Sequence, residues 1–220
     1  MSDGACEVAE QAIQEHLFGS DASASGPTTD LSTTQLLVSK ILENADRLKW
    51  SLQGLGMLRT YLSKAVRLHI WDDRFEVPNV SKTHTHPWDI DDSTVVCGKI
   101  TNRLYRVIDY KLTKTHHEQR IQCGADGKTV GEKRGVNLEL HREYVVPAGQ
   151  AYFQKHDEPH DTLAERGTIT IVTRRFRPDT EHASVFFPFG TEWVPGIPRP
   201  ATPAEVATIV EGALQRLQGK

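Results

Sequence analysis

The spacing of apolar positions divides the chain into a first part with a helical rhythm and a longer part with short alternating runs. Apolar residues recur at three- and four-residue steps over residues 5–18 and again over about 31–66. Such steps place side chains on one face of an α-helix. A Ser-, Gly- and Pro-rich stretch separates the two segments, and Asp30 or Ser32 can cap the second. The pattern predicts two or three helices, with Gly54 and Gly56 bending or breaking the last one.

From about residue 67 the chain consists of short runs rich in β-branched and aromatic residues, bounded by Gly, Pro, Asn or Asp. The runs cover residues 67–77, 93–100, 102–113, 118–123, 136–146, 150–155 and 167–176. Closely spaced strands of this kind indicate an antiparallel sandwich or barrel. Ala125-Asp126-Gly127-Lys128 is typical of a hairpin turn, because Asp-Gly tolerates positive φ.

The end of the chain has the signature of one more helix. Thr202-Pro203-Ala204-Glu205 is a capping box with proline at the first helical position. No internal repeat is visible, so one barrel is expected. The predicted fold is mostly β, with a helical N-terminal extension over 1–66, an antiparallel β-barrel of the jelly-roll type over 67–195, and a C-terminal helix over 196–220.

Composition describes an ordinary globular protein and excludes several classes. Of the 220 residues, 38% are hydrophobic and 25% charged, and the net charge of -3 gives no reason to expect nucleic acid. No apolar run is long enough to span a membrane, and the N-terminus lacks the basic start and apolar core of a signal peptide. Cys6, Cys97 and Cys123 lie far apart. We therefore expect a cytoplasmic protein without disulfides.

The candidate chemistry begins at His84-Thr85-His86. Two histidines separated by one residue point the same way on a β-strand, so they can offer two imidazoles to one metal ion. A third, distant histidine such as His160 completes a site only if a second strand lies alongside. The spacing predicts a metal, a β architecture and a pocket together.

Residues 84–98 (HTHPWDIDDSTVVCG), with Asp91 and Gly98 at motif spacing, resemble the first motif of the cupin superfamily. The spacing from Gly149 to His160 resembles the second motif, although Lys155 and Asp157 replace its usual proline and glycine. The resemblance covers about residues 68–190. It implies a cupin-type barrel that binds a metal and frequently dimerises.

The resemblance also implies a ligand set. His84, His86 and His160 would hold the metal, with Asp91 either a fourth ligand or a solvated loop acid. His156 competes with His160 for the third place, and otherwise it is a pocket residue or a residue that supports the metal ligands. Many cupins similar to this chain are iron oxygenases, so Fe(II) is favoured, while Zn, Ni, Mn and Cu also suit imidazole ligands.

Other residues are candidates for the pocket around the metal. Tyr105 and Tyr152 offer phenols that could donate a hydrogen bond or move a proton, although an amphipathic aromatic in the barrel wall is the commoner role of such a residue. Trp88, two residues after His86, is well placed to line the pocket. An inward-pointing strand arginine such as Arg174 would suit a carboxylate, and Cys97 is either near the metal or structural.

Three functions follow in order of preference. The first is an Fe(II) oxygenase or dioxygenase acting on a small polar, amino-acid- or thiol-like substrate with O₂; a site without Asp91 would resemble the thiol dioxygenases. The second is a metal-dependent lyase, isomerase or hydrolase that uses no O₂. The third is a non-enzymatic binding cupin. The expected partners are the small substrate and a second copy of the chain, with no nucleic acid and no membrane.

Overall fold

The structure is a computed structural model that describes residues 30–109, 112–122, 128–191, 193–194 and 196–219. The helical elements are α2 (Leu31–Leu42), the 3-10 turn η1 (Ala45–Arg47) and α3 (Pro203–Leu217). The strands are β1 (Trp50–Gln53), β2 (Leu55–Tyr61), β3 (Val66–Glu76), β4 (Thr83–His84), β5 (Trp88–Cys97), β6 (Lys99–Ile108), β7 (His116–Gln122), β8 (Thr129–Pro147), β9 (Ala151–Gln154), β10 (His160–Ala164), β11 (Ile169–Phe176), β12 (His182–Pro188) and β13 (Arg199–Pro200).

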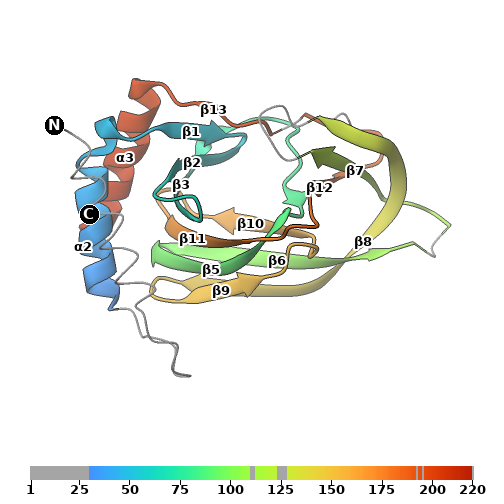
Figure 1. Ribbon diagram of the computed structural model, residues 1–220, viewed down its shortest axis with the longest axis horizontal. Helices are drawn as coiled ribbons and strands as arrows, with labels where there is room; N and C mark the ends of the chain where they lie inside the picture. Colours follow the sequence, from blue (N-terminus) through green and yellow to red (C-terminus); the bar gives the residue numbers. More distant parts are fainter. Residues whose placement is uncertain (1–29, 110–111, 123–127, 192, 195, 220) are drawn as a thin grey trace.

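Two antiparallel arrays of strands make up the β structure (Figure 1). Seven strands form one sheet in the order β13-β1-β2-β3-β11-β5-β9, and the other six form a closed barrel in the order β10-β4-β12-β7-β8-β6. All the named strand pairs run antiparallel. The predicted mostly-β fold of the antiparallel jelly-roll type is therefore confirmed.

The largest apolar core lies between the seven-stranded sheet and the two helices. Leu68 and Ile70 of β3 and Ile171 of β11 are buried in one cluster with Val38 of α2 and Ile209 of α3. Figure 1 shows α2 and α3 side by side at one end of the strands. Because side chains alternate along a strand, burying one face of the sheet in this core leaves the opposite face for the cavity.

Local signals at the helix ends agree with the sequence. The side chain of Asp30 caps α2 by accepting hydrogen bonds from the amides of Ser32 and Thr33. Thr202 and Glu205 form the predicted capping box, with proline at the start of α3. Of the helices in the described residues, none is long and apolar enough to cross a membrane.

The prediction of helix over 31–66 is wrong beyond α2 and η1. Strands β1 and β2 lie inside that range, so the β structure begins at Trp50 rather than at residue 67. Gly56, the second residue of β2, has φ 73°, and a Cβ at this position would lie 2.6 Å from the carbonyl oxygen of Asp72. The predicted helix over 5–18, Cys6, Cys123 and most of the turn at residues 125–128 lie outside the described residues.

Candidate metal centre

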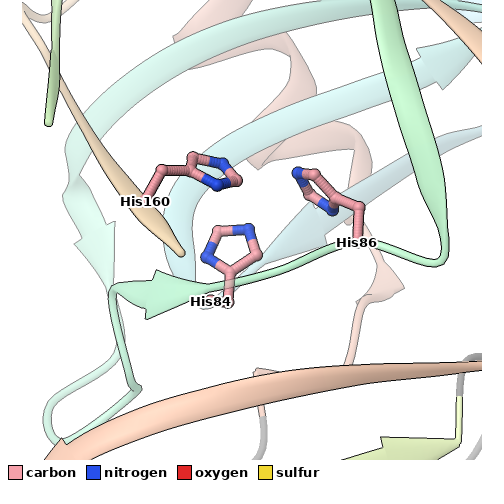
Figure 2. A group of neighbouring side chains, drawn as sticks. All are labelled: His84, His86 and His160. Carbon is pink, nitrogen blue, oxygen red and sulfur yellow. The ribbon is translucent and has the colours of Figure 1, made fainter. Parts of the chain in front are cut away.

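Three histidines meet at a cavity that is lined by residues of both strand arrays. His84 lies on β4, His160 begins β10, and the two are paired across these strands. His86 follows β4, and its ring centroid lies 4.8 Å from that of His84 and 4.9 Å from that of His160. Nitrogen atoms of the three rings lie within 4.8 Å of one another, and Figure 2 shows the rings pointing toward a common centre.

Backbone and aromatic contacts fix the orientation of these rings. Nδ1 of His84 lies 2.9 Å from the carbonyl oxygen of Lys82, and Nδ1 of His160 lies 3.2 Å from that of Glu158. In each ring a protonated Nδ1 donates to the carbonyl. The neutral ring then has a lone pair on Nε2, which is available to a metal ion. The ring of His86 stacks on Trp88 with centroids 4.0 Å apart. Such supporting contacts are characteristic of histidine ligands.

The alternation that predicted this pair holds, although only His84 is on a regular strand. Between the two histidines, Thr85 turns to β12, where its amide donates to the carbonyl of Ser184 and its hydroxyl accepts from the Ser184 amide, each at 2.8 Å. An extended backbone with Thr85 facing the neighbouring strand puts both imidazoles on the other side.

The electrostatic environment keeps the imidazoles neutral. Burial lowers the pKa of His84, and it lowers the pKa values of His86 and His160 well below the ordinary value, with further lowering by the neighbouring histidines. Metal ions bind the neutral imidazole, so the site has the protonation state that a metal requires. Three convergent neutral nitrogens with fixed rings fit Fe, Zn, Cu or Ni.

Asp91 does not join this cluster. Its side chain is exposed and forms an ion pair with Arg175 of β11. Trp88 and Ile90 are the residues of that stretch that line the cavity, so Asp91 between Ile90 and the next inward residue faces away from it. The fourth-ligand interpretation of Asp91 is corrected to a surface ion pair.

Replacing Asp91 with asparagine is therefore expected to leave the metal content unchanged. The substitution removes only an exposed ion pair, which contributes roughly 0–1 kcal/mol to stability. Metal analysis of the purified variant beside the wild-type protein measures this. A loss of metal in Asp91→Asn would show that the carboxylate is a ligand after all.

His156 lies outside the cavity and is not the third histidine. Its Nδ1 is 3.1 Å from Oδ1 of the buried Asp89, and its amide donates to the same oxygen at 2.9 Å. The guanidinium of Arg177 donates to the other oxygen of Asp89. His156 therefore belongs to a hydrogen-bond network around the buried Asp89, and its predicted role as a substrate-binding residue is wrong.

Tyr105 and Cys97 are also placed away from the cavity. The Tyr105 hydroxyl donates to Oδ2 of Asp161 at 2.7 Å, on the side of β10 opposite to His160. Cys97 is buried in the core under the helices, where desolvation raises the pKa of its thiol. Neither residue can touch a substrate beside the histidines, so both predicted roles are corrected to structural ones.

The remaining candidates line one cavity together with the three histidines. This cavity has a volume of about 1390 Å³, and Trp88, Tyr152 and Arg174 contribute to its wall. Burial raises the pKa of Tyr152 to about 12, so its phenol keeps its proton at neutral pH. Sequence reasoning did not find several other side chains of the sheet that line the cavity, among them Arg59, Tyr61, Arg67 and His69.

Acid is expected to destabilise the protein because its buried histidines resist protonation. Burial and nearby arginines lower the pKa of His69 well below 6.5, whereas the unfolded chain has the ordinary value. The stability contributed by the neutral ring is complete above about pH 6.5 and is lost as the pH falls. Each such histidine adds a slope of up to about 1.4 kcal/mol per pH unit.

Urea unfolding of metal-free protein at a series of pH values from 7.5 to about 5 measures this slope. His69→Gln removes one contribution, so its free energy of unfolding should fall less steeply with acid than that of the wild-type protein. Parallel slopes would contradict the assignment.

Comparisons with known proteins leave the family open. No protein-family model matches the chain, and no curated protein matches it. Among solved structures it is similar to vicilin from tomato (Solanum lycopersicum), at 9% identity over 74% of this chain, with a TM-score of 0.20. The chain spans 52% of that vicilin chain. The strand topology and the histidine cluster, which do not depend on this likeness, are compatible with a cupin.

Proposed function

We propose that this protein is a metal-dependent enzyme of the cupin type, an Fe(II) oxygenase that acts on a small polar, amino-acid- or thiol-like molecule. The observation that carries the proposal is the meeting of His84, His86 and His160 at the wall of a large cavity, three neutral imidazoles that no carboxylate of the described residues joins. A three-histidine set resembles that of the thiol dioxygenases. Bound iron would supply O₂ activation and open positions for substrate beside the three ligands.

The residues around the histidines have distinct tasks in this proposal. The carbonyls of Lys82 and Glu158 and the indole of Trp88 hold the ligand rings in place before substrate arrives. Tyr152 packs beside Trp88 in a small apolar cluster and keeps its proton. It is therefore suited to donate a hydrogen bond to the substrate and poorly suited to act as a base.

Oxygen uptake by iron-loaded protein tests the proposal. The panel comprises thiols, amino acids and their carboxylated and phosphorylated derivatives, each measured with an oxygen electrode. We expect uptake that depends on one substrate class and disappears in His160→Ala, with the exposed His182→Ala as the matched control. No uptake with any member of the panel, despite one bound iron per chain, would overturn the oxygenase proposal.

The same three-histidine cluster also favours a second function. Three histidines are a known ligand set of catalytic zinc. A zinc enzyme of this kind would be a lyase, isomerase or hydrolase that needs no O₂. The two proposals differ in the metal retained and in its response to nitric oxide. Iron gives a paramagnetic nitrosyl signal, whereas zinc that resists chelation and gives no signal would favour the second function.

A further inference from the structure

Three arginines face the cavity from neighbouring strands of the seven-stranded sheet. Arg59 lies on β2, Arg67 on β3 and Arg174 on β11, and all three line the same cavity as the histidines. Each alternates with residues that pack toward the helices, such as Leu58 and Leu68. The strand order β2-β3-β11 makes the three strands adjacent, so their inward residues gather at one place.

The three guanidinium groups converge on two aromatic rings. Their central carbons lie 5.7, 4.8 and 5.1 Å from the centroid of the Tyr61 ring for Arg59, Arg67 and Arg174 respectively. Those of Arg67 and Arg174 also lie 5.0 and 5.4 Å from the centroid of the Trp88 ring, which stacks on the ring of His86. The arginine cluster (Arg59, Arg67, Arg174) is therefore one aromatic ring away from the histidines.

Within the described part of the chain, no carboxylate forms a hydrogen bond or ion pair with this cluster. Arg59 donates to the hydroxyl of Ser51, Arg67 to that of Tyr61, and Arg174 to the carbonyl of Lys64. Other arginines on this sheet or directly after it do have acidic partners. Arg74 pairs with Asp72, Arg175 with Asp91, and Arg177, which follows β11, with Asp89.

The guanidinium charges of this cluster are largely buried, so the absence of an acidic partner in the described part of the chain is significant. Arg67 and Arg174 are each only 8% exposed, and Nε of both is buried without a hydrogen-bond partner among the described residues. Buried charges are normally paired, because an unpaired one is costly. The charges also perturb Tyr61, since burial would raise the pKa of its phenol but the surrounding arginines outweigh burial and lower it. An anion bound here would offset this positive charge.

We propose that the arginine cluster binds a doubly charged oxyanion group of the substrate, a phosphate monoester or a dicarboxylate. Planar guanidinium groups bind such groups through paired hydrogen bonds. The buried Nε atoms of Arg67 and Arg174, without a partner among the described residues, show that the hydrogen-bonding capacity of these two guanidinium groups is not filled by the protein. Only the ring of Trp88 separates the arginine cluster from the histidines. A substrate whose anionic group binds the arginines would therefore place its other, reacting end at the metal centre. This second part rests on the proposed function, whereas the anion site itself does not.

Calorimetric titration of metal-free protein in a non-phosphate buffer tests the site. The probes are inorganic phosphate, malonate and acetate. We expect phosphate or malonate to bind and acetate to bind at least about 10-fold more weakly, with affinity falling as salt is added. The stronger of the two dianions identifies the source of the oxyanion. No binding of either dianion at millimolar concentrations would overturn the proposal.

Variants locate the binding to the cluster. Arg174→Gln should weaken binding of the dianion by about 10- to 100-fold, since hydrogen bonds to charged groups contribute that much. Arg175→Gln is the matched control. Arg175 follows Arg174 on β11, but its side chain points away from the cavity and pairs with Asp91. Arg59→Gln, at a less buried position, repeats the test if Arg174→Gln unfolds. Equal affinity in folded Arg174→Gln or Arg59→Gln would overturn the assignment.

His84→Ala separates this inference from the proposed function. We expect the variant to lose metal and still bind the dianion, which shows that the arginines rather than a metal hold it. Loss of dianion binding in folded His84→Ala would contradict the arginine site. Retained dianion binding in a wild-type protein that takes up no metal would overturn only the proposed function.

Discussion

Replacing His84 or His160 with alanine is expected to abolish metal binding, with a loss of affinity of at least about 100-fold. This estimate is a lower limit, because residues that only support a metal ligand already contribute 10- to 100-fold. Each substitution removes one of three convergent nitrogens and leaves an incomplete site. The measurement is metal content after purification, followed by titration of the metal-free protein with Fe(II) and Zn(II).

The exposed His182 provides the control for this prediction. His182→Ala removes an imidazole from β12 without touching the cluster, so its metal content should match that of the wild-type protein. Circular dichroism establishes that each variant is folded. A folded His84→Ala protein that binds metal as tightly as the wild type would contradict the assignment of the site.

Leu68→Ala is expected to destabilise the protein by about 2–5 kcal/mol, because it creates a cavity in the main core. Leu68 is 0% exposed and packs in the cluster that joins the seven-stranded sheet to α2 and α3. The measurement tests where the main core lies. The structure places it between the seven-stranded sheet and the helices, outside the closed barrel. Urea unfolding of metal-free protein measures the free energy without a contribution from bound metal.

Leu140→Ala makes the same chemical change at an exposed strand position. Leu140 is 56% exposed on β8, so its loss should change the free energy of unfolding by no more than about 0.5 kcal/mol. If the two leucine variants were equally stable, the sheet-helix core would not be the main source of stability.

Most strands from residue 67 onward and the histidine pair could be predicted because short-range alternation determines both. Strands β4, β10 and β12 lie outside the predicted runs. His84 and His86 face one way for the same reason that Leu68 and Ile70 do. His160 could be identified only through the spacing of the cupin motif. Its register opposite His84 depends on how β10 and β4 pair, which the sequence of either strand alone does not specify.

The misassigned segment before residue 67 shows how helical and hairpin spacings coincide. Leu52 and Leu58 fit a helical rhythm, yet they are directly opposite each other in the β1-β2 hairpin and share one core. Arg59 was missed because of this error. Arg67 lies in a segment that was predicted as a strand, but alternation alone does not specify which face of the strand lines the cavity. A period of two was present in Arg59 and Tyr61 around Thr60, and again in Arg67 and His69 around Leu68.

The predictions for Asp91, Tyr105 and His156 were wrong because of strand register and of interaction partners that are distant in sequence. Asp91 has the motif spacing, but a register irregularity between β5 and β11 occurs beside it, and Arg175 pairs with it on the outside. Tyr105 and His156 are engaged by Asp161 and Asp89, which are distant in sequence. Such ion pairs and hydrogen bonds across strands follow from tertiary structure and have no local signature.

The most direct test of the central claim is an anomalous-scattering map of crystals grown from metal-loaded protein, recorded at the absorption edge of the bound metal. We predict one peak per chain, bonded to imidazole nitrogens of His84, His86 and His160 and not to Asp91. A peak elsewhere, or no peak between these rings in protein saturated with Fe(II) or Zn(II), would contradict the account.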